Sequence, residues 1–158
     1  MEKYTLQYEQ IGQAGLNQVW KFFSDPRNLP LITPPGMKFK TLTSNLPDEI
    51  HDDLVIEYRV SPLMGYSTNW VSRIKKVKAP DFFIDEQQNG PYRLWIHEHR
   101  FKQVDGGILV SDKVTYALPV PFLGFLVNTF LIKPKLDSIF NFRRKKINEL
   151  FNSFNHTQ

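Results

Sequence analysis

The feature that most constrains the fold is a series of strand-length segments between residues 54 and 118, in which apolar and polar residues alternate and turn residues intervene. The sequence Asp105-Gly106-Gly107 is the strongest turn signal, because it is typical of a tight hairpin between antiparallel strands. Consecutive strands joined by short turns form an antiparallel meander. Together with a shorter candidate at 37–43, strands are expected at 54–60, 67–77, 81–88, 93–104 and 108–118.

Elements of other kinds flank this meander. Residues 2–11 predict a first strand, residues 16–23 a short helix that Pro26 ends, and residues 27–32 a second helical turn. Apolar residues recur every three or four positions from Leu136 to Phe154, which predicts a long amphipathic helix with Pro134 in its first turn or at a kink. This order predicts an α+β helix-grip fold, in which a curved antiparallel sheet of about seven strands wraps around the C-terminal helix.

One face of the strand at 93–104 combines aromatic and ionisable residues. Successive side chains of a strand point to opposite faces, so every second residue from Trp95 to Phe101, including His97 and His99, shares one face. Two aromatic rings beside two imidazoles suit the wall of a half-polar cavity. A solid core wall with two satisfied histidines is the alternative.

The hairpin turn decides which residues lie opposite this face. If Asp105-Gly106 is a two-residue turn, or part of a four-residue loop, Asp112 lies opposite His99 and can stabilise its imidazolium or fix its tautomer. A three-residue loop would send Asp112 to the other face. The pairs expected from the first register are His99 with Asp112, His97 with Val114, and Trp95 with Tyr116.

The preceding strand carries a third carboxylate. Phe83, Asp85 and Gln87 share one face of the segment 81–88. Whether this is the face of His97 depends on the turn at 89–91, where Pro91 makes a simple two-residue hairpin unfavourable.

Composition narrows the class of protein. A chain of 158 residues is the size of one domain, which we assign to 1–158, and its 13 Phe supply bulky walls for a core or a pocket. The chain has no cysteine, which excludes disulfides and thiolate metal sites. No leader or membrane-spanning run is evident, so we expect a cytoplasmic protein without stable membrane insertion, as a monomer or weak homodimer.

The net charge of +4 comes from one segment. Six basic residues between Lys133 and Lys146 face a single acid, Asp137. This pattern favours the solvated side of a helix over a nucleic-acid site, and no nucleic-acid partner is expected. Arg143 and Arg144 lie beside the apolar stripe, where one of them could reach a pocket carboxylate, although solvation is the favoured interpretation.

Several stretches resemble the SRPBCC ligand-binding proteins of the START-like superfamily, and in particular a bacterial, polyketide cyclase-like subgroup that is sometimes fused to sugar-nucleotide epimerase-like domains. The resemblance covers residues 19–26, 31–35 and 70–74 and extends to the final helix, and it is closest over 83–101 together with Asp112, Tyr116 and Pro119. It implies a helix-grip fold with a hydrophobic pocket, but no reaction, because catalytic residues are not shared across the superfamily. The sequence departs from the pattern at His51-Asp52-Asp53, where related sequences often have a glycine.

Three interpretations of the polar cluster remain open. It is a buried network that fixes the sheet register, or a set of acid–base and orienting groups formed by His97, His99, Asp85 and Asp112. The third and weakest is a metal site at His97 and His99 with Asp112 as third ligand. We expect no metal and no cofactor.

The predicted function is binding of a hydrophobic or amphipathic small molecule (lipid-, polyketide- or aromatic-like) between the sheet and the C-terminal helix, with entry near residues 120–126. That apolar segment forms a portal or is simply packed on the sheet. The alternative is a cyclase, dehydratase or isomerase that uses the same polar cluster. The expected ligand contacts are Trp70, Phe83, Gln87, Trp95, His97, His99, Phe101, Val114, Tyr116, Phe122, Phe125, Leu136 and Phe140.

Overall fold

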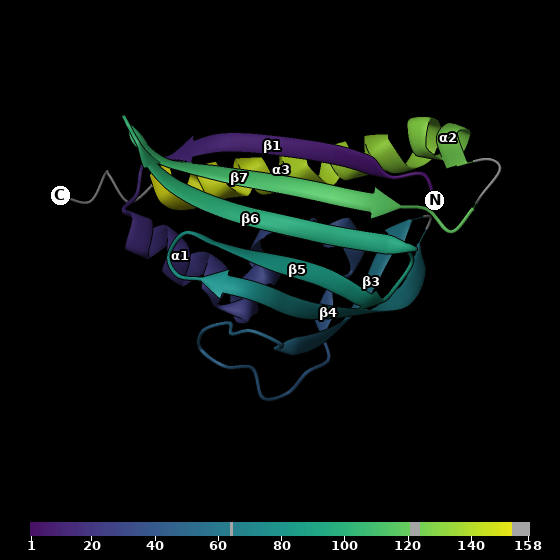
Figure 1. Ribbon diagram of the computed structural model, residues 1–158, viewed down its shortest axis with the longest axis horizontal. Helices are drawn as coiled ribbons and strands as arrows, with labels where there is room; N and C mark the ends of the chain where they lie inside the picture. The colour runs from purple at the N-terminus through teal and green to yellow at the C-terminus, as the bar shows by residue number, and fades with distance from the viewer. Residues whose placement is uncertain (64, 121–123, 153–158) are drawn as a thin grey trace.

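The computed structural model describes residues 1–63, 65–120 and 124–152. Within these residues the chain forms one seven-stranded antiparallel sheet in the order β1-β7-β6-β5-β4-β3-β2 (Figure 1). The first strand pairs with the last, so β1 forms one edge of the sheet with β7 beside it. The strands are β1 Tyr4–Gly12, β2 Lys40–Thr41, β3 Val55–Leu63, β4 Tyr66–Lys78, β5 Phe82–Asn89, β6 Leu94–Val104 and β7 Gly107–Ala117.

The helices cover one face of this sheet. Helix α1 (Leu16–Ser24) leads into the short 3-10 segments η1 (Pro26–Ile32) and η2 (Pro35–Met37). After β7, the chain forms α2 (Gly124–Val127), a π-helical segment η3 (Asn128–Ile132) and the long helix α3 (Lys133–Asn152). Figure 1 shows α3 running along the back of β1 and β7. A curved sheet that holds a long C-terminal helix is the predicted helix-grip α+β fold, which is confirmed.

Helix α3 packs through the stripe that the sequence predicted. Leu136, Phe140 and Ile147 are buried against the sheet. Pro134 is the second residue of α3 and lacks an N–H group, so it cannot continue the helical hydrogen bonds, which explains the wider π turn directly before it. Among the described residues, no helix has the length and apolar character that are required to cross a bilayer.

The β6–β7 hairpin has the predicted register. Val104 pairs with Gly107 across the turn, whose glycine Gly106 has a φ of 88° that a side chain would strain. His99 therefore lies opposite Asp112 and the other expected pairs are also formed. In the neighbouring pair of strands, Asp85 lies opposite His97 and Phe83 opposite His99, so β5 presents its carboxylate on the face of the histidines.

The strand expected at 37–43 is largely wrong. Only Lys40–Thr41 pairs with β3, because Pro35 begins a 3-10 turn and Lys38 adopts a left-handed φ of 47°, which interrupts an extended chain. The second helical turn is present as η1, where Pro26 and Pro30 remove backbone donors and favour the short 3-10 form.

In the turn before β3, Asp53 occupies the left-handed position for which the sequence has no glycine. Asp53 has a φ of 62°, a left-handed conformation that aspartate adopts more readily than most residues. Its neighbour Asp52 accepts a hydrogen bond from the backbone N–H of Val77 at 2.6 Å, which holds this turn against β4.

The core is divided into separate groups of side chains. Within the described residues, one group centres on α1 and the C-terminal half of α3. A second centres on β6, β7 and the start of α3, and a third on β3. Phe83, Trp95 and Tyr58 belong to the first, second and third group respectively. The space between these groups is the cavity described below.

Candidate functional site

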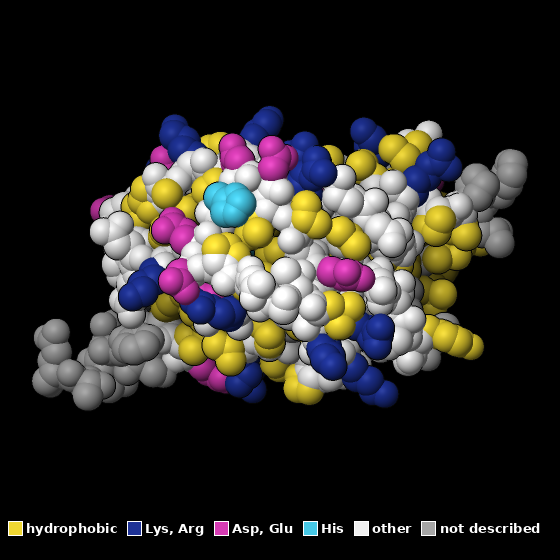
Figure 2. Space-filling model, turned by 90° about the horizontal axis from the view of Figure 1, so that it is seen from below, with side chains coloured by type: hydrophobic (Ala, Val, Ile, Leu, Met, Phe, Trp, Pro, Cys, Tyr) yellow, Lys and Arg dark blue, Asp and Glu magenta, His cyan; other side chains and the backbone are white. Residues whose placement is uncertain are grey.

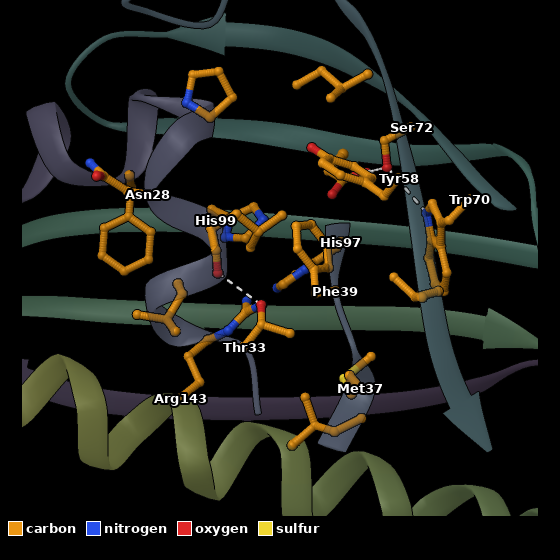
Figure 3. A pocket seen from close by; sticks show the side chains of 18 of the residues that line it. Asn28, Thr33, Met37, Phe39, Tyr58, Trp70, Ser72, His97, His99 and Arg143 are labelled. Atoms are coloured by element: carbon orange, nitrogen blue, oxygen red, sulfur yellow. Dashed lines mark hydrogen bonds between the residues drawn. The ribbon is translucent and has the colours of Figure 1, made fainter. Parts of the chain in front are cut away.

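A cavity of about 150 Å³ lies between the sheet, the η1–η2 segment and α3 (Figure 3). A volume of this order holds one substituted aromatic ring. The lining is mainly apolar and aromatic, and includes Phe39, Tyr58, Trp70, Tyr92 and Trp95. Polar groups enter it from several elements: Ser72 from β4, Asp85 from β5, His97 and His99 from β6, and Arg143 from α3.

The sequence pattern predicted part of the cavity wall, namely the part that the sheet and α3 form. Of the residues predicted there, the structure places the following in the lining: Trp70, Phe83, Asp85, Trp95, His97, His99, Leu136 and Phe140. It was not expected that residues 26–39 would form the opposite wall, because this irregular segment has no periodicity to read. Ser72 could have been found, since it shares a strand face with Trp70.

Five of the expected ligand contacts do not line this cavity. Gln87 holds the turn after β5 through hydrogen bonds with the backbone of Tyr92, at 2.7 and 3.3 Å. Phe101 packs in the core with its ring centre 4.9 Å from that of Phe23. Val114 and Tyr116 are 0% exposed beneath α3, where the Tyr116 hydroxyl donates to Asn128 Oδ1 at 2.6 Å.

The fifth such residue, Phe125, belongs to the expected portal at residues 120–126. It is 63% exposed on α2, and Val120 and Leu126 are also exposed. Phe122 and its neighbours Pro121 and Leu123 lie outside the described residues. Figure 2 shows hydrophobic side chains gathering at the end of the molecule where Figure 1 places α2.

Asp112 lies behind the two histidines and orients one of them. His97 Nε2 lies 2.7 Å from Asp112 Oδ1, and because a carboxylate only accepts, this nitrogen carries the hydrogen. His99 Nδ1 is 3.1 Å from the same oxygen but lacks hydrogen-bond geometry. The register prediction was right, yet the hydrogen bond comes from His97 and not from the directly opposite His99, because the side chain of Asp112 reaches diagonally along the sheet.

The protonation states within this group follow from burial and from the pair. Burial lowers the pKa of His97 to about 3, and the neighbouring His99 adds to the effect. Burial alone would raise the pKa of Asp112, but its interactions with His97 and His99 outweigh burial and hold the pKa well below its usual range. The result is a neutral imidazole hydrogen-bonded to an ionised carboxylate.

Asp85 occupies a different environment on the same face. Its Oδ1 accepts a hydrogen bond from Ser72 Oγ at 2.7 Å, and Ser72 Oγ in turn accepts one from Trp70 Nε1 at 3.2 Å. Burial raises the pKa of Asp85, although Ser72 and the nearby positive charge of Arg143 act in the opposite direction. Burial therefore favours the protonated acid at Asp85 and the pair with histidine favours the carboxylate at Asp112.

Arg143 corrects the expectation that the basic residues of α3 are solvated. It is 9% exposed, lines the cavity, and has its Cζ atom 5.1 Å from the centre of the Phe140 ring. Its spacing could have indicated this position, because Arg143 follows Leu136 by seven residues and precedes Ile147 by four, which places all three on one helix face. Burial lowers its pKa, but arginine remains a cation in proteins.

A metal site would use a different third ligand from the one the sequence suggested. Among the described residues, Asp85, His97 and His99 offer donor atoms within 4.8 Å of one another, whereas Asp112 is engaged behind the histidines. Two imidazoles and a carboxylate are suitable ligands for a transition metal. The guanidinium of Arg143 faces the same cavity, however, and its charge opposes a divalent cation there.

No protein-family model and no curated protein sequence matches this chain, whereas solved structures do. The KanY protein has a TM-score of 0.72 at 13% identity over 96% of this chain and 99% of its own. The di-domain ARO/CYC StfQ from the steffimycin biosynthetic pathway also has a TM-score of 0.72, at 9% identity over 96% of this chain and 51% of its own. The nucleoside-diphosphate sugar epimerase from Corynebacterium glutamicum has a TM-score of 0.64 at 20% identity, over 91% of this chain and 28% of its own. These likenesses establish the architecture, and the chain therefore has the helix-grip fold that its resemblance to the SRPBCC proteins predicted.

Proposed function

We propose that residues 1–158 form a single domain that binds an amphipathic small molecule in the cavity between the sheet, η1–η2 and α3. The observation that carries this proposal is the convergence of Asp85, His97, His99 and Arg143 on a cavity whose lining is otherwise mainly aliphatic and aromatic. Ligand sites combine an apolar lining with a few placed polar groups in this way. The apolar body of the ligand packs among the rings, and its polar end meets the ionisable groups.

A purely structural role accounts for only part of this arrangement. The pair of His97 and Asp112 is mutually satisfied and holds β6 to β7, as a register-fixing network would. Asp85 and Arg143 come from β5 and α3 and both face the cavity. Ionisable groups buried beside an open space make the fold less stable than apolar side chains that fill the space. This cost favours a binding role for these groups over a purely structural one.

Isothermal titration calorimetry with cinnamyl alcohol, a neutral molecule with one aromatic ring that matches the cavity volume, tests the proposal. The wild-type chain is expected to show a saturable binding isotherm. Ile139→Trp fills the cavity from α3 and should abolish this signal, whereas Ser138→Trp adds the same side chain at the exposed neighbouring position and should not. Absence of saturable binding in wild type, or equal binding in Ile139→Trp with retained circular dichroism, would contradict the proposal.

A second candidate is an enzyme of the cyclase, dehydratase or isomerase type. The observation that favours it is the opposite perturbation of two carboxyl groups: the pKa of Asp85 is raised by burial, whereas that of Asp112 is lowered by the histidines. Groups separated in this way suit the roles of acid and base, with Asp85 in the cavity lining and Asp112 acting through His97, which it orients from behind. Asp85→Asn should then abolish turnover of an added polyketide-like or aromatic substrate while probe binding persists, and turnover that survives this change would exclude Asp85 as the acid.

A further inference from the structure

Arg143 has hydrogen-bonding capacity that the described part of the chain leaves unused. Its guanidinium lines the cavity, and neither Nε nor Nη1 has a hydrogen-bond partner among the described residues. Arg143 is buried, with 9% of the residue and 11% of its side chain exposed. A buried cation without such partners is costly, because it has lost its water and nothing replaces it.

The neighbouring groups do not replace that water. Asp112 Oδ1 is 4.0 Å from Arg143 Nη1, beyond hydrogen-bond distance, and the same oxygen already accepts from His97. The ring of Phe140 offers a cation–π contact, which offsets part of the charge without using any N–H donor. Nε and Nη1 of Arg143 therefore remain available to a ligand in the cavity.

The chemistry of these donors selects the kind of ligand. A guanidinium binds a carboxylate through two parallel hydrogen bonds, and such charge-assisted pairs are stronger than neutral ones. Figure 3 shows Arg143 rising from the helix toward His97 and His99, with Trp70 on the far side of His97. The geometry points to an amphipathic carboxylate as the ligand, bound by Arg143 through its carboxylate and by the aromatic side chains around Trp70 through its apolar body; this inference rests on the binding function proposed above.

Asp85 is compatible with a second carboxylate in the cavity. Burial raises its pKa, so that its neutral acid form persists to a higher pH than that of an exposed carboxyl group. A neutral acid does not repel the ligand and can donate a hydrogen bond to one of its oxygens. Arg143 then supplies the charge that the ligand requires, and Asp85 a donor beside it.

Matched pairs of acid and alcohol test this inference on the wild-type chain. Binding of trans-cinnamate is compared with that of cinnamyl alcohol, and binding of octanoate with that of octanol, by isothermal titration calorimetry. Since each pair shares its apolar body, a bidentate pair with arginine should make the acid bind about ten- to a hundredfold more tightly in at least one pair. If the alcohols bind and neither acid is preferred, the inference is overturned while the binding function stands. If the acids and the alcohols all fail to bind, both the inference and the binding function are overturned.

Variants locate the preference. Arg143→Met keeps the length of the side chain without its charge and should remove the preference for the acid, with little change for the alcohol. Arg144→Met removes the exposed neighbouring arginine on the same helix and should behave as wild type. If folded Arg143→Met still binds the acid more tightly than the alcohol, another group causes the preference and the inference is overturned. If Arg143→Met fails to fold, Arg143→Lys is the substitute, because it retains the charge but cannot form two parallel hydrogen bonds with a carboxylate. An unchanged preference for the acid in Arg143→Lys would equally overturn the proposed bidentate binding.

Discussion

The buried imidazole of His97 should make the stability of this domain depend on pH. His97 is 4% exposed, and burial holds its pKa at about 3 in the folded chain, against about 6.5 in an unfolded chain. Between these values the unfolded state binds a proton that the native state does not. The stabilisation is therefore complete above about pH 6.5 and is lost as the pH falls toward 3.

The size of the effect follows from the two pKa values. A difference between about 6.5 and about 3 corresponds to at most about 5 kcal/mol in the free energy of unfolding. Asp85 acts in the opposite direction: its raised pKa stabilises the native state at low pH, and this contribution is lost as the pH rises through the native value. The contribution of His97 must therefore be read from the difference between wild type and a variant.

His97→Gln is the suitable variant, because the amide nitrogen can still donate to Asp112 and carries no titratable proton. Urea unfolding followed by tryptophan fluorescence between pH 7 and pH 4 gives the free energy of unfolding of both chains. The advantage of wild type over His97→Gln should shrink as the pH falls, by an amount on the order of 1 kcal/mol per pH unit. Parallel profiles would refute the reasoning, and His51→Gln, at an exposed histidine, serves as the control.

Other changes test the remaining interactions. Asp112→Ala removes the acceptor of His97 and the carboxylate nearest to Arg143, and should lower the free energy of unfolding by about 3–5 kcal/mol in urea titrations; a loss below about 1 kcal/mol would show that the pair is not structural. Tyr116→Phe leaves the buried Asn128 oxygen unpaired and should cost about 1–3 kcal/mol, measured in the same way, and an unchanged midpoint would argue against that bond. Elemental analysis after dialysis against zinc should show no stoichiometric metal, because the guanidinium of Arg143 faces the candidate donors; one zinc per chain, lost in His99→Ala, would contradict this.

The local pattern was sufficient for most of the sheet. Strand alternation and the Asp105-Gly106 turn predicted the β6–β7 register and the face shared by Trp95, His97 and His99, because a strand has a period of two and a tight turn leaves one register. Most of the strand predicted at 37–43 does not form, because Pro35 begins a 3-10 turn and Lys38 adopts a left-handed conformation, and both interrupt the extended backbone.

What the sequence determined by itself is the order of elements, the buried faces and hence the fold. Only the tertiary structure decided which side chains meet: that His97 and not His99 is hydrogen-bonded to Asp112, and that Arg143 on the inner face of α3 reaches the same cavity as the two histidines. Periodicity assigns a residue to a face, whereas the distance between side chains on β5, β6 and α3 depends on the curvature of the sheet and the rotation of the helix. Both are set by long-range packing, which leaves no mark on the local sequence. For that reason the alternation within β6 did not reveal that Arg143 lies across the cavity from the two histidines, and the proposed preference for a carboxylate depends on that arginine.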